Sequence, residues 1–316
     1  MSPAVGVRLT SGRGRALRLV CMALVLAGAL AGCSAGGRGD TAVVVAGAES
    51  PEQVLLSTLT VQALKAQGYR VVDKTALGSP WVVRSALEAG NVDLCWEYTG
   101  DTWMVHLGHD RPISDPAEVY ARVREEDAAR GIIWLAPAPC LRTMGLVVAR
   151  EEARSLGIAS ISDLARHVAR VDPFTSLCTP EGLCGLAGGV RGVERVYGTR
   201  FNPKHLVYGS IEEGYERAAR GECLCAMGYS LDAGLITHDL VVLADDRGFF
   251  QASNLAVAVR APVLEALPGL EEDLGRLSAV LTREAMTGML RRVTVDGEKP
   301  EAVVKRFLDD HDPLGR

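Results

Sequence analysis

Apolar and amphipathic segments alternate regularly in the first part of this chain. The run 41–47 (TAVVVAG) is continuously apolar and ends in glycine, which is typical of a buried parallel strand. A helix is predicted to begin at Ser50, where serine is the cap and proline follows in the first turn. A strand over 69–73, a helix over 79–88 and a strand over 92–96 come next. This alternation predicts a parallel α/β sheet, whose ligands bind beyond the carboxyl ends of the strands.

The segment that ends the third predicted strand is rich in aromatic and acidic side chains. Two tryptophans, one tyrosine and two carboxylates fall within the eight residues 96–103. Aromatic faces attract cations by about 0.5–2 kcal/mol each, and a neighbouring carboxylate adds complementary charge. We therefore predict that Tyr98 and Asp101, at the strand end, grip a cation. The alternative is a strand whose aromatic side chains pack beneath a helix.

Residues 1–32 have the composition of an export signal. Four arginines and no acidic residue accompany an apolar run over 19–30, which is too short for a stable transmembrane helix. The run ends in Leu-Ala-Gly before Cys33, the pattern of a bacterial lipoprotein cleavage box. We predict a lipid attached to Cys33, a tether over 33–40, and a mature protein held on the outer face of the cell membrane. The alternative is an ordinary signal peptide that happens to contain a cysteine.

The chain that remains after the signal is mildly acidic. Loss of the four signal arginines takes the formal charge from −5 to −9. Binding of nucleic acid needs a basic face, so this charge argues against a nucleic-acid partner. It is compatible with a small cationic ligand, although bulk charge says little about any one site.

The cysteines agree with export to an oxidising compartment. Six of the eight remain once those of the signal and the lipid attachment are set aside: Cys95, Cys140, Cys178, Cys184, Cys223 and Cys225. An even number predicts up to three disulfides among fifteen possible connectivities, and we favour a bridge between Cys178 and Cys184. The alternative is a metal site that uses Cys223 and Cys225. It is disfavoured because the chain has no C-x-x-C spacing.

The second half of the chain continues the mixture of helices and strands. Helices are predicted over 116–130, 161–169, 189–197 and 211–219, and a mostly helical tail over 264–309. Strands are predicted over 144–148, 223–227, 240–243 and 255–259, and a Gly/Pro-rich loop over 174–186. A second α/β unit therefore follows the first.

Several short motifs occur along the chain in a characteristic order. The most specific is 96–100 (WEYTG), and the weaker ones are 52–53 (EQ), 161–164 (ISDL), 180–183 (PEGL), 229–232 (YSLD) and 240–246 (LVVLADD). In series they resemble the substrate-binding lipoproteins of osmoprotectant ABC importers, the glycine betaine/choline/carnitine type. The resemblance covers nearly the whole mature chain. It implies an α/β fold of the type II periplasmic-binding-protein kind, with two mixed, mostly parallel sheets flanked by helices and a cleft between two lobes. Lobe 1 would comprise 41–142 and 249–316, and lobe 2 would comprise 143–248.

The resemblance also implies a ligand site in that cleft, of which this chain keeps a part. Family members enclose a quaternary ammonium in a box of tyrosines, and Tyr98 and Tyr229 match two of its positions. Two further positions that are usually aromatic are Met144 and Ser253 here. Methionine can line an apolar pocket, whereas serine offers no aromatic face. Three other aromatic side chains are candidates to compensate: Trp103, Trp81 and Phe250.

The carboxylate end of the implied site is altered further. Betaine binders of the family commonly have a lysine after the first strand and an arginine before the Pro-Asp/Glu-Gly-Leu turn, and these positions are Ala48 and Thr179 here. The residue after Tyr-Thr-Gly, often threonine, is Asp101. A ligand carboxylate would then meet no basic partner and one like charge. We therefore predict a choline-like or other cationic solute in preference to glycine betaine, within a site that includes Asp101 and Thr179.

The implied function is capture of a solute by closure of the two lobes, followed by delivery to an ABC permease served by a separate ATPase. We predict a monomer. We also predict no catalytic residues, metal or cofactor, since no phosphate loop, dinucleotide fingerprint or nucleophile elbow occurs. The alternative is a lipoprotein of the same fold whose site has decayed and which senses or scaffolds. An enzyme that uses the cysteines as a thiol oxidoreductase is a more distant alternative.

Overall fold

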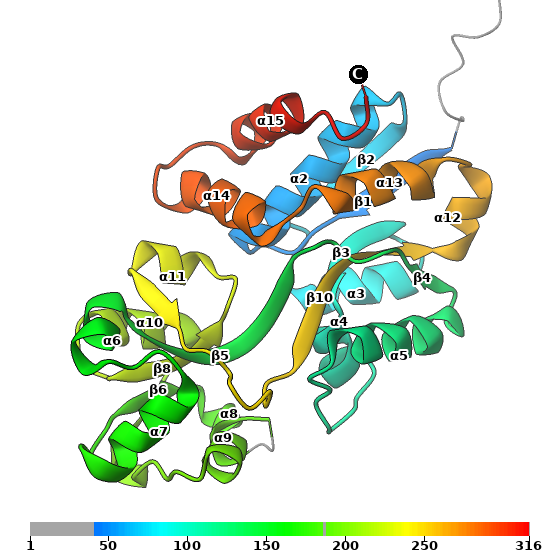
Figure 1. The fold of residues 1–316 in the computed structure, drawn as a ribbon. Helices are drawn as coiled ribbons and strands as arrows, with labels where there is room; N and C mark the ends of the chain where they lie inside the picture. Colours follow the sequence, from blue (N-terminus) through cyan, green and yellow to red (C-terminus); the bar gives the residue numbers. More distant parts are fainter. Residues whose placement is uncertain (1–40, 186–187, 316) are drawn as a thin grey trace, which may run out of the picture.

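The computed structural model describes residues 41–185 and 188–315 (Figure 1). The predicted signal over 1–32, the tether over 33–40 and the lipid attachment at Cys33 lie outside the described residues. Within them, two mixed β-sheets are flanked by helices, as the sequence predicts. The two sheets are joined into one ten-stranded arrangement by the antiparallel pairing of β5 with β10.

The elements keep the labels of Figure 1. The strands are β1 (Ala42–Ala46), β2 (Arg70–Lys74), β3 (Leu94–Tyr98), β4 (Ile132–Trp134), β5 (Leu141–Ala149), β6 (Leu177–Thr179), β7 (Leu206–Tyr208), β8 (Cys225–Tyr229), β9 (Leu240–Val242) and β10 (Ala252–Arg260). The α-helices are α2 (Pro51–Ala66), α3 (Pro80–Glu88), α4 (Thr99–Asp101), α5 (Pro116–Ala128), α6 (Arg150–Leu156), α7 (Ile161–Arg170), α8 (Glu181–Cys184), α9 (Val190–Tyr197), α10 (Ile211–Ala219), α11 (Ala233–Thr237), α12 (Ala261–Ala266), α13 (Leu270–Ala279), α14 (Arg283–Thr294) and α15 (Pro300–His311). Two short segments have other helical geometry: the π-helical η1 (Thr102–His106) and the 3-10 helical η2 (Pro203–His205).

Side-chain caps fix where the first two helices begin. The Ser50 hydroxyl accepts a hydrogen bond from the backbone N–H of Gln53, and the Ser79 hydroxyl accepts one from Val82. Proline occupies the first turn of both α2 and α3, where its missing N–H is no loss. Both helices therefore start directly after the loops at the carboxyl ends of β1 and β2.

The first sheet is covered by helices on both faces. Strand β1 pairs in parallel with β2 and β3, and β10 runs antiparallel to β3 and β4. Along β1, Val43 and Val45 pack in a core with α2, α13, α14 and α15. Val44 and Ala46 pack in the opposite core with α3 and α5. Because both faces pack against helices, the strand is apolar at every position.

The second sheet is built around β5. This strand is antiparallel to β8 and β9, while β6 pairs in parallel with β7 and β8. Leu146 and Val148 of β5 pack with α7 and α9, and Val147 between them packs with α10 on the other face. This sheet, too, has helices on both sides.

Strands β5 and β10 run through both halves of the molecule. Residues 141–143 of β5 pair with residues 252–254 of β10, in a register that sets Arg142 opposite Ser253. Beyond this paired stretch β5 pairs within the second sheet, and β10 pairs within the first. Figure 1 shows the two strands side by side between the two sheets.

The predicted bridge between Cys178 and Cys184 is wrong. Cys178 is bonded to Cys223, with the two Cα atoms 6.0 Å apart. The physical reason is the parallel pairing of β6 with β8, which brings Cys178 level with Ala226 and close to the residues that precede β8. Cys184 lies on α8 without a disulfide.

Replacing both bridged cysteines with alanine (C178A/C223A) is expected to lower the free energy of unfolding by about 2–4 kcal/mol. The bridge spans 45 residues of sequence, so it restricts the unfolded chain considerably. Urea unfolding under oxidising conditions measures the difference. Cys184→Ala, at an unbridged and half-buried position, is the matched control and should cost less than about 1 kcal/mol. Equal stability of the double variant and the wild type would contradict the prediction.

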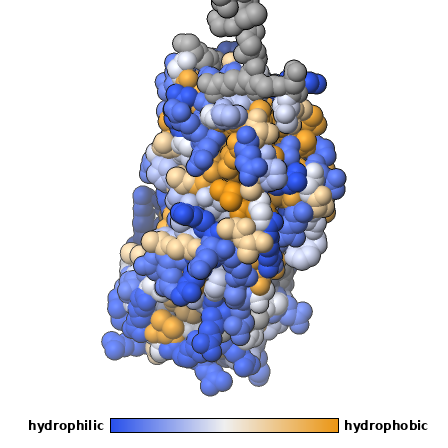
Figure 2. All heavy atoms as spheres, turned by 90° about the vertical axis from the view of Figure 1, so that its right-hand side faces the viewer, coloured by the Kyte–Doolittle hydropathy of each residue, from blue (hydrophilic) through white to orange (hydrophobic). Residues whose placement is uncertain are grey.

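The exposed surface is mixed in character. Figure 2 shows the face that lies on the right in Figure 1, where hydrophilic residues cover most of the lower half and apolar residues gather in the upper half. Large apolar side chains that remain exposed include Trp81, Val105 and Phe174. Within residues 41–185 and 188–315, no helix combines the length and apolar character needed to cross a membrane.

Candidate functional site

The turn after β3 is pressed closely against β10. Strand β3 ends at Tyr98, and the chain enters α4 and η1 directly. A Cβ atom at Gly100 would lie 2.7 Å from the carbonyl oxygen of Ala252 and 2.7 Å from Ser253 Oγ, so this turn requires glycine. The Gly100 N–H donates to Ser253 Oγ over 2.9 Å. Ser253 therefore fixes the turn that presents Asp101.

A cavity of about 430 Å³ opens beside this turn and between the two sheets. Asp101 and Ser253 line it from the side of the first sheet, while Met144 and Tyr229 line it from β5 and β8 of the second. Phe250, one of the candidates for compensating the lost aromatic residues, also lines it. The structure thus brings four of the predicted ligand residues to one cavity.

Arg142 lies between the two predicted tyrosines. Its guanidinium carbon is 3.9 Å from the centre of the Tyr98 ring and 4.4 Å from the centre of the Tyr229 ring. Both distances are within the range of cation–π attraction, about 6 Å. The same guanidinium donates a hydrogen bond to Asp101 and forms an ion pair with it. The tyrosines and the acid that the sequence assigns to a solute therefore surround a cation that the chain itself supplies.

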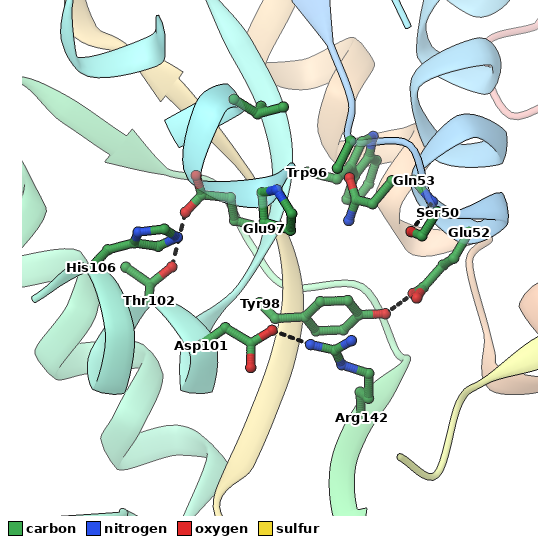
Figure 3. A pocket seen from close by; sticks show the side chains of 13 residues that line it. Ser50, Glu52, Gln53, Trp96, Glu97, Tyr98, Asp101, Thr102, His106 and Arg142 are labelled. Atoms are coloured by element: carbon green, nitrogen blue, oxygen red, sulfur yellow. Dashed lines mark hydrogen bonds and ion pairs between the residues drawn. The ribbon is translucent and has the colours of Figure 1, made fainter. Parts of the chain in front are cut away.

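Glu52, in the first turn of α2, completes this arrangement from behind (Figure 3). It accepts a hydrogen bond from the Tyr98 hydroxyl. Burial raises the pKa of Glu52 to about 7, although Arg142 and the Tyr98 hydrogen bond act in the opposite direction. Burial likewise raises the pKa of Tyr98 well above its usual range. The Tyr98 ring is thus held at its hydroxyl end by a carboxyl group that titrates near neutral pH.

The stability of the wild type relative to Glu52→Gln is expected to fall as pH rises from about 4.5 to about 7. In this window folded Glu52 keeps a proton that it loses in the unfolded chain, so the folded state binds more protons and rising pH disfavours it. The total change is on the order of 3 kcal/mol. Denaturant unfolding of both proteins at intervals across the window measures it. A relative stability that stays constant or increases would contradict the assignment.

Two other predicted ligand residues point elsewhere. The Trp103 ring stacks on His109 with centres 3.5 Å apart, and its indole N–H donates to the Arg111 carbonyl over 2.8 Å. Thr179 is buried at the end of β6, where its hydroxyl donates to the carbonyl of Pro180 over 3.3 Å. Neither residue is among those that line the cavity.

A smaller cavity of about 90 Å³ lies behind the tyrosine and the aspartate, on the side of α2 and α3 (Figure 3). Glu52, Tyr98, Asp101 and Arg142 line it together with His106. Within the described residues, Arg142 Nε and His106 Nδ1 are buried without a hydrogen-bond partner. Burial is also the main reason that the pKa of His106 is lowered. The described residues contain no group of three or more side chains suited to a metal ion.

Sequence reasoning missed the parts played by Arg142 and Glu52. It counted no cation at the site, and Arg142 is one. A charged residue two positions before Met144, itself matched to a cage position, was a usable signal. Glu52 stood in a quoted motif directly after the first strand, at the edge where ligands bind. Both signals were present, but only the fold brings the two side chains to Tyr98.

The family described as the substrate binding domain of ABC-type glycine betaine transport systems, OpuAC, matches residues 41–310. The chain belongs to the OpuAC family. OpuAC proteins are solute-binding proteins, so this chain binds a small solute of the quaternary-amine osmoprotectant class for an ABC importer. It acts outside the cytoplasm and is not an enzyme, as predicted.

Individual OpuAC-like relatives agree with this assignment. The chain is 30% identical to the glycine-betaine-binding protein of Pseudomonas aeruginosa, over 94% of this chain and 95% of the relative. It is 26% identical to the glycine betaine-binding protein YehZ of Escherichia coli, over 81% of this chain and 86% of the relative. The structure of apo YehZ matches with a TM-score of 0.74 at 24% identity, covering 87% of this chain and all of that one (100%). This likeness shows that the fold is the predicted periplasmic-binding-protein fold.

Proposed function

We propose that this protein captures a quaternary-amine or other cationic solute between Tyr98 and Tyr229 and delivers it to an ABC permease. One observation carries the proposal: ring faces from β3 and β8, in different sheets, converge on a single cation with Asp101 beside them. Such an enclosure attracts cations of other origin through the same ring electrostatics. Relatives and solved structures that are named for glycine betaine, carnitine or choline support a quaternary ammonium as the bound group.

Capture would proceed by closure of two lobes, 41–142 with 249–316 and 143–248. The paired stretch of β5 and β10 supplies the hinge, because both strands pass from one sheet to the other there. A solute held by Tyr98 on one side and Tyr229 on the other stabilises the closed state by its higher affinity for that state. The closed, monomeric protein would dock on its permease while a lipid on Cys33 keeps it at the outer face of the membrane.

Among possible solutes we propose a choline-like cation over glycine betaine. The described lining of the larger cavity includes the carboxylates of Asp101 and Asp110 and one guanidinium, that of Arg142. Because Asp101 already pairs with Arg142, a ligand carboxylate would have to break that pair to gain a basic partner. Positions 48 and 179 offer no further cation, since they hold alanine and threonine. The surplus of acid at the cavity therefore favours a ligand without a carboxylate.

Titration calorimetry with choline and glycine betaine tests both the function and this preference. Choline is expected to bind about tenfold more tightly, a difference of about 1.4 kcal/mol. Tighter binding of glycine betaine would overturn the preference while leaving the solute-binding function in place. The absence of any heat of binding with choline, with glycine betaine and with a wider panel of quaternary amines and polyamines would overturn the function.

The position of Arg142 also fits a second function. Arg142 fills the space between the tyrosines, as it would in a site that no longer takes a solute. Such a protein would be a sensory or scaffolding lipoprotein with the same fold. Thermal stability separates the two, because a bound solute raises the melting temperature according to its concentration relative to the dissociation constant, and a decayed site shows no shift.

A further inference from the structure

Buried Arg84 and half-buried Arg142 are held in very different ways. The side chain of Arg84 is 2% exposed and is surrounded by carboxylates. It pairs with Asp127 over 2.6 and 2.9 Å, with Glu88 over 2.7 Å and with Glu97 over 3.1 Å. All of its nitrogens therefore have acidic partners, as expected of an arginine that serves the structure.

The nitrogens of Arg142 do not all have acidic partners. Its carboxylate partner is Asp101, whose own side chain is 46% exposed, and an exposed partner makes a weak ion pair. Its Nε is buried without a hydrogen-bond partner among residues 41–185 and 188–315. What surrounds its guanidinium instead is the faces of Tyr98 and Tyr229. These are the groups that suit a quaternary ammonium, which needs no hydrogen bond.

Arg142 also lies where the two sheets meet. It lies on β5 in the short stretch that pairs with β10, opposite Ser253. The two rings that it touches come from β3 of the first sheet and β8 of the second. Arg142 thus joins the two halves of the molecule at the same point, and through the same rings, as the proposed solute.

We propose that Arg142 is an internal occupant of the aromatic cage, which a cationic solute must expel in order to bind. This inference rests on the proposed function, because it concerns the same pair of tyrosines. The apparent affinity for a solute is then the affinity of the free cage multiplied by the small fraction of molecules in which Arg142 has left it. Arg142 thereby restricts binding to cations that have a high affinity for the free cage.

Calorimetric titration with tetramethylammonium tests the proposal, because this probe is a quaternary ammonium with no hydroxyl or carboxylate. Arg142→Ala is expected to bind the probe at least about tenfold more tightly than the wild type, which is about 1.4 kcal/mol. Arg150→Ala is the matched control: this arginine follows β5, pairs with exposed Asp239 and does not line the cage cavity. It should bind the probe as the wild type does. Equal or weaker binding by Arg142→Ala would overturn the proposal.

A second measurement needs no variant of the cage. In protein with isotope-labelled arginine, the ring currents of Tyr98 and Tyr229 shift the side-chain NMR signals of Arg142 upfield. Saturating tetramethylammonium should return these signals towards their solvent positions, and signals that stay unmoved at saturation would overturn the proposal. A wild type that ignores every solute beside an Arg142→Ala variant that binds the probe would support this inference and count against the proposed function. The two ideas can therefore fail separately.

Discussion

Removing the Tyr229 ring (Tyr229→Ala) is expected to weaken choline binding by about ten- to a hundredfold, or about 1.4–2.8 kcal/mol. The ring lies at the end of β8, where it lines the cavity between the sheets and contacts the same Arg142 guanidinium as the Tyr98 ring. Its loss removes cation–π attraction and opens that part of the cavity to water, which screens the remaining charges. Titration calorimetry measures the change in the dissociation constant.

Two variants control for this result. Tyr229→Phe keeps the aromatic face and should stay within about threefold of the wild type. Tyr208→Ala removes a half-exposed tyrosine of the same sheet that does not line the cavity, and should have no effect. The loss should be largest in an Arg142→Ala background, because in the wild type Arg142 loses the same ring as the solute. Unchanged binding by Tyr229→Ala in both backgrounds would contradict the assignment.

Arg84→Met is expected to lower the free energy of unfolding by about 3–5 kcal/mol. Arg84 joins α3 to the buried carboxylate of Asp127 on α5 and to Glu97 on β3. The indole N–H of Trp134 also donates to Asp127, over 2.7 Å. Without the guanidinium, Asp127 at 0% exposure is a buried charge with no cation beside it. Chemical denaturation measures the loss.

Arg130→Ala is the matched control for Arg84. Its guanidinium is 42% exposed and lies 3.8 Å from Glu88, so its removal should cost less than about 1 kcal/mol. An additional Asp127→Asn change should recover part of the stability of Arg84→Met, since it removes the stranded charge. Equal stability of Arg84→Met and Arg130→Ala would contradict the account of the network.

The fold followed from the sequence where local signals were strong. The apolar run at β1 and the serine–proline starts of α2 and α3 each specify one structure. The region 174–186, predicted as a loop, contains β6 and α8. Its glycines and prolines mask a three-residue strand that exists because β7 and β8 flank it. The bond between Cys178 and Cys223 depends on the same pairing, so spacing in the sequence could not reveal it.

The residues of the site, too, were predicted only in part. Tyr98 and Asp101 were found because they stand at a strand end within a distinctive cluster, and Tyr229 was found through the family motif. Arg142 was missed because its partners are set by the register of β5 against β10 and β8, which no local pattern encodes. The Glu52–Tyr98 hydrogen bond likewise joins residues 46 positions apart. Predictions made from single positions omit the charges that tertiary contacts bring to a site.

A crystal structure of the protein with choline tests the central claim most directly. The account predicts choline in the cavity between the sheets, with its quaternary nitrogen within about 6 Å of the centres of both the Tyr98 and the Tyr229 rings, and with the Arg142 guanidinium moved off them. Choline bound at any other place, with Arg142 still between the two rings, would contradict it.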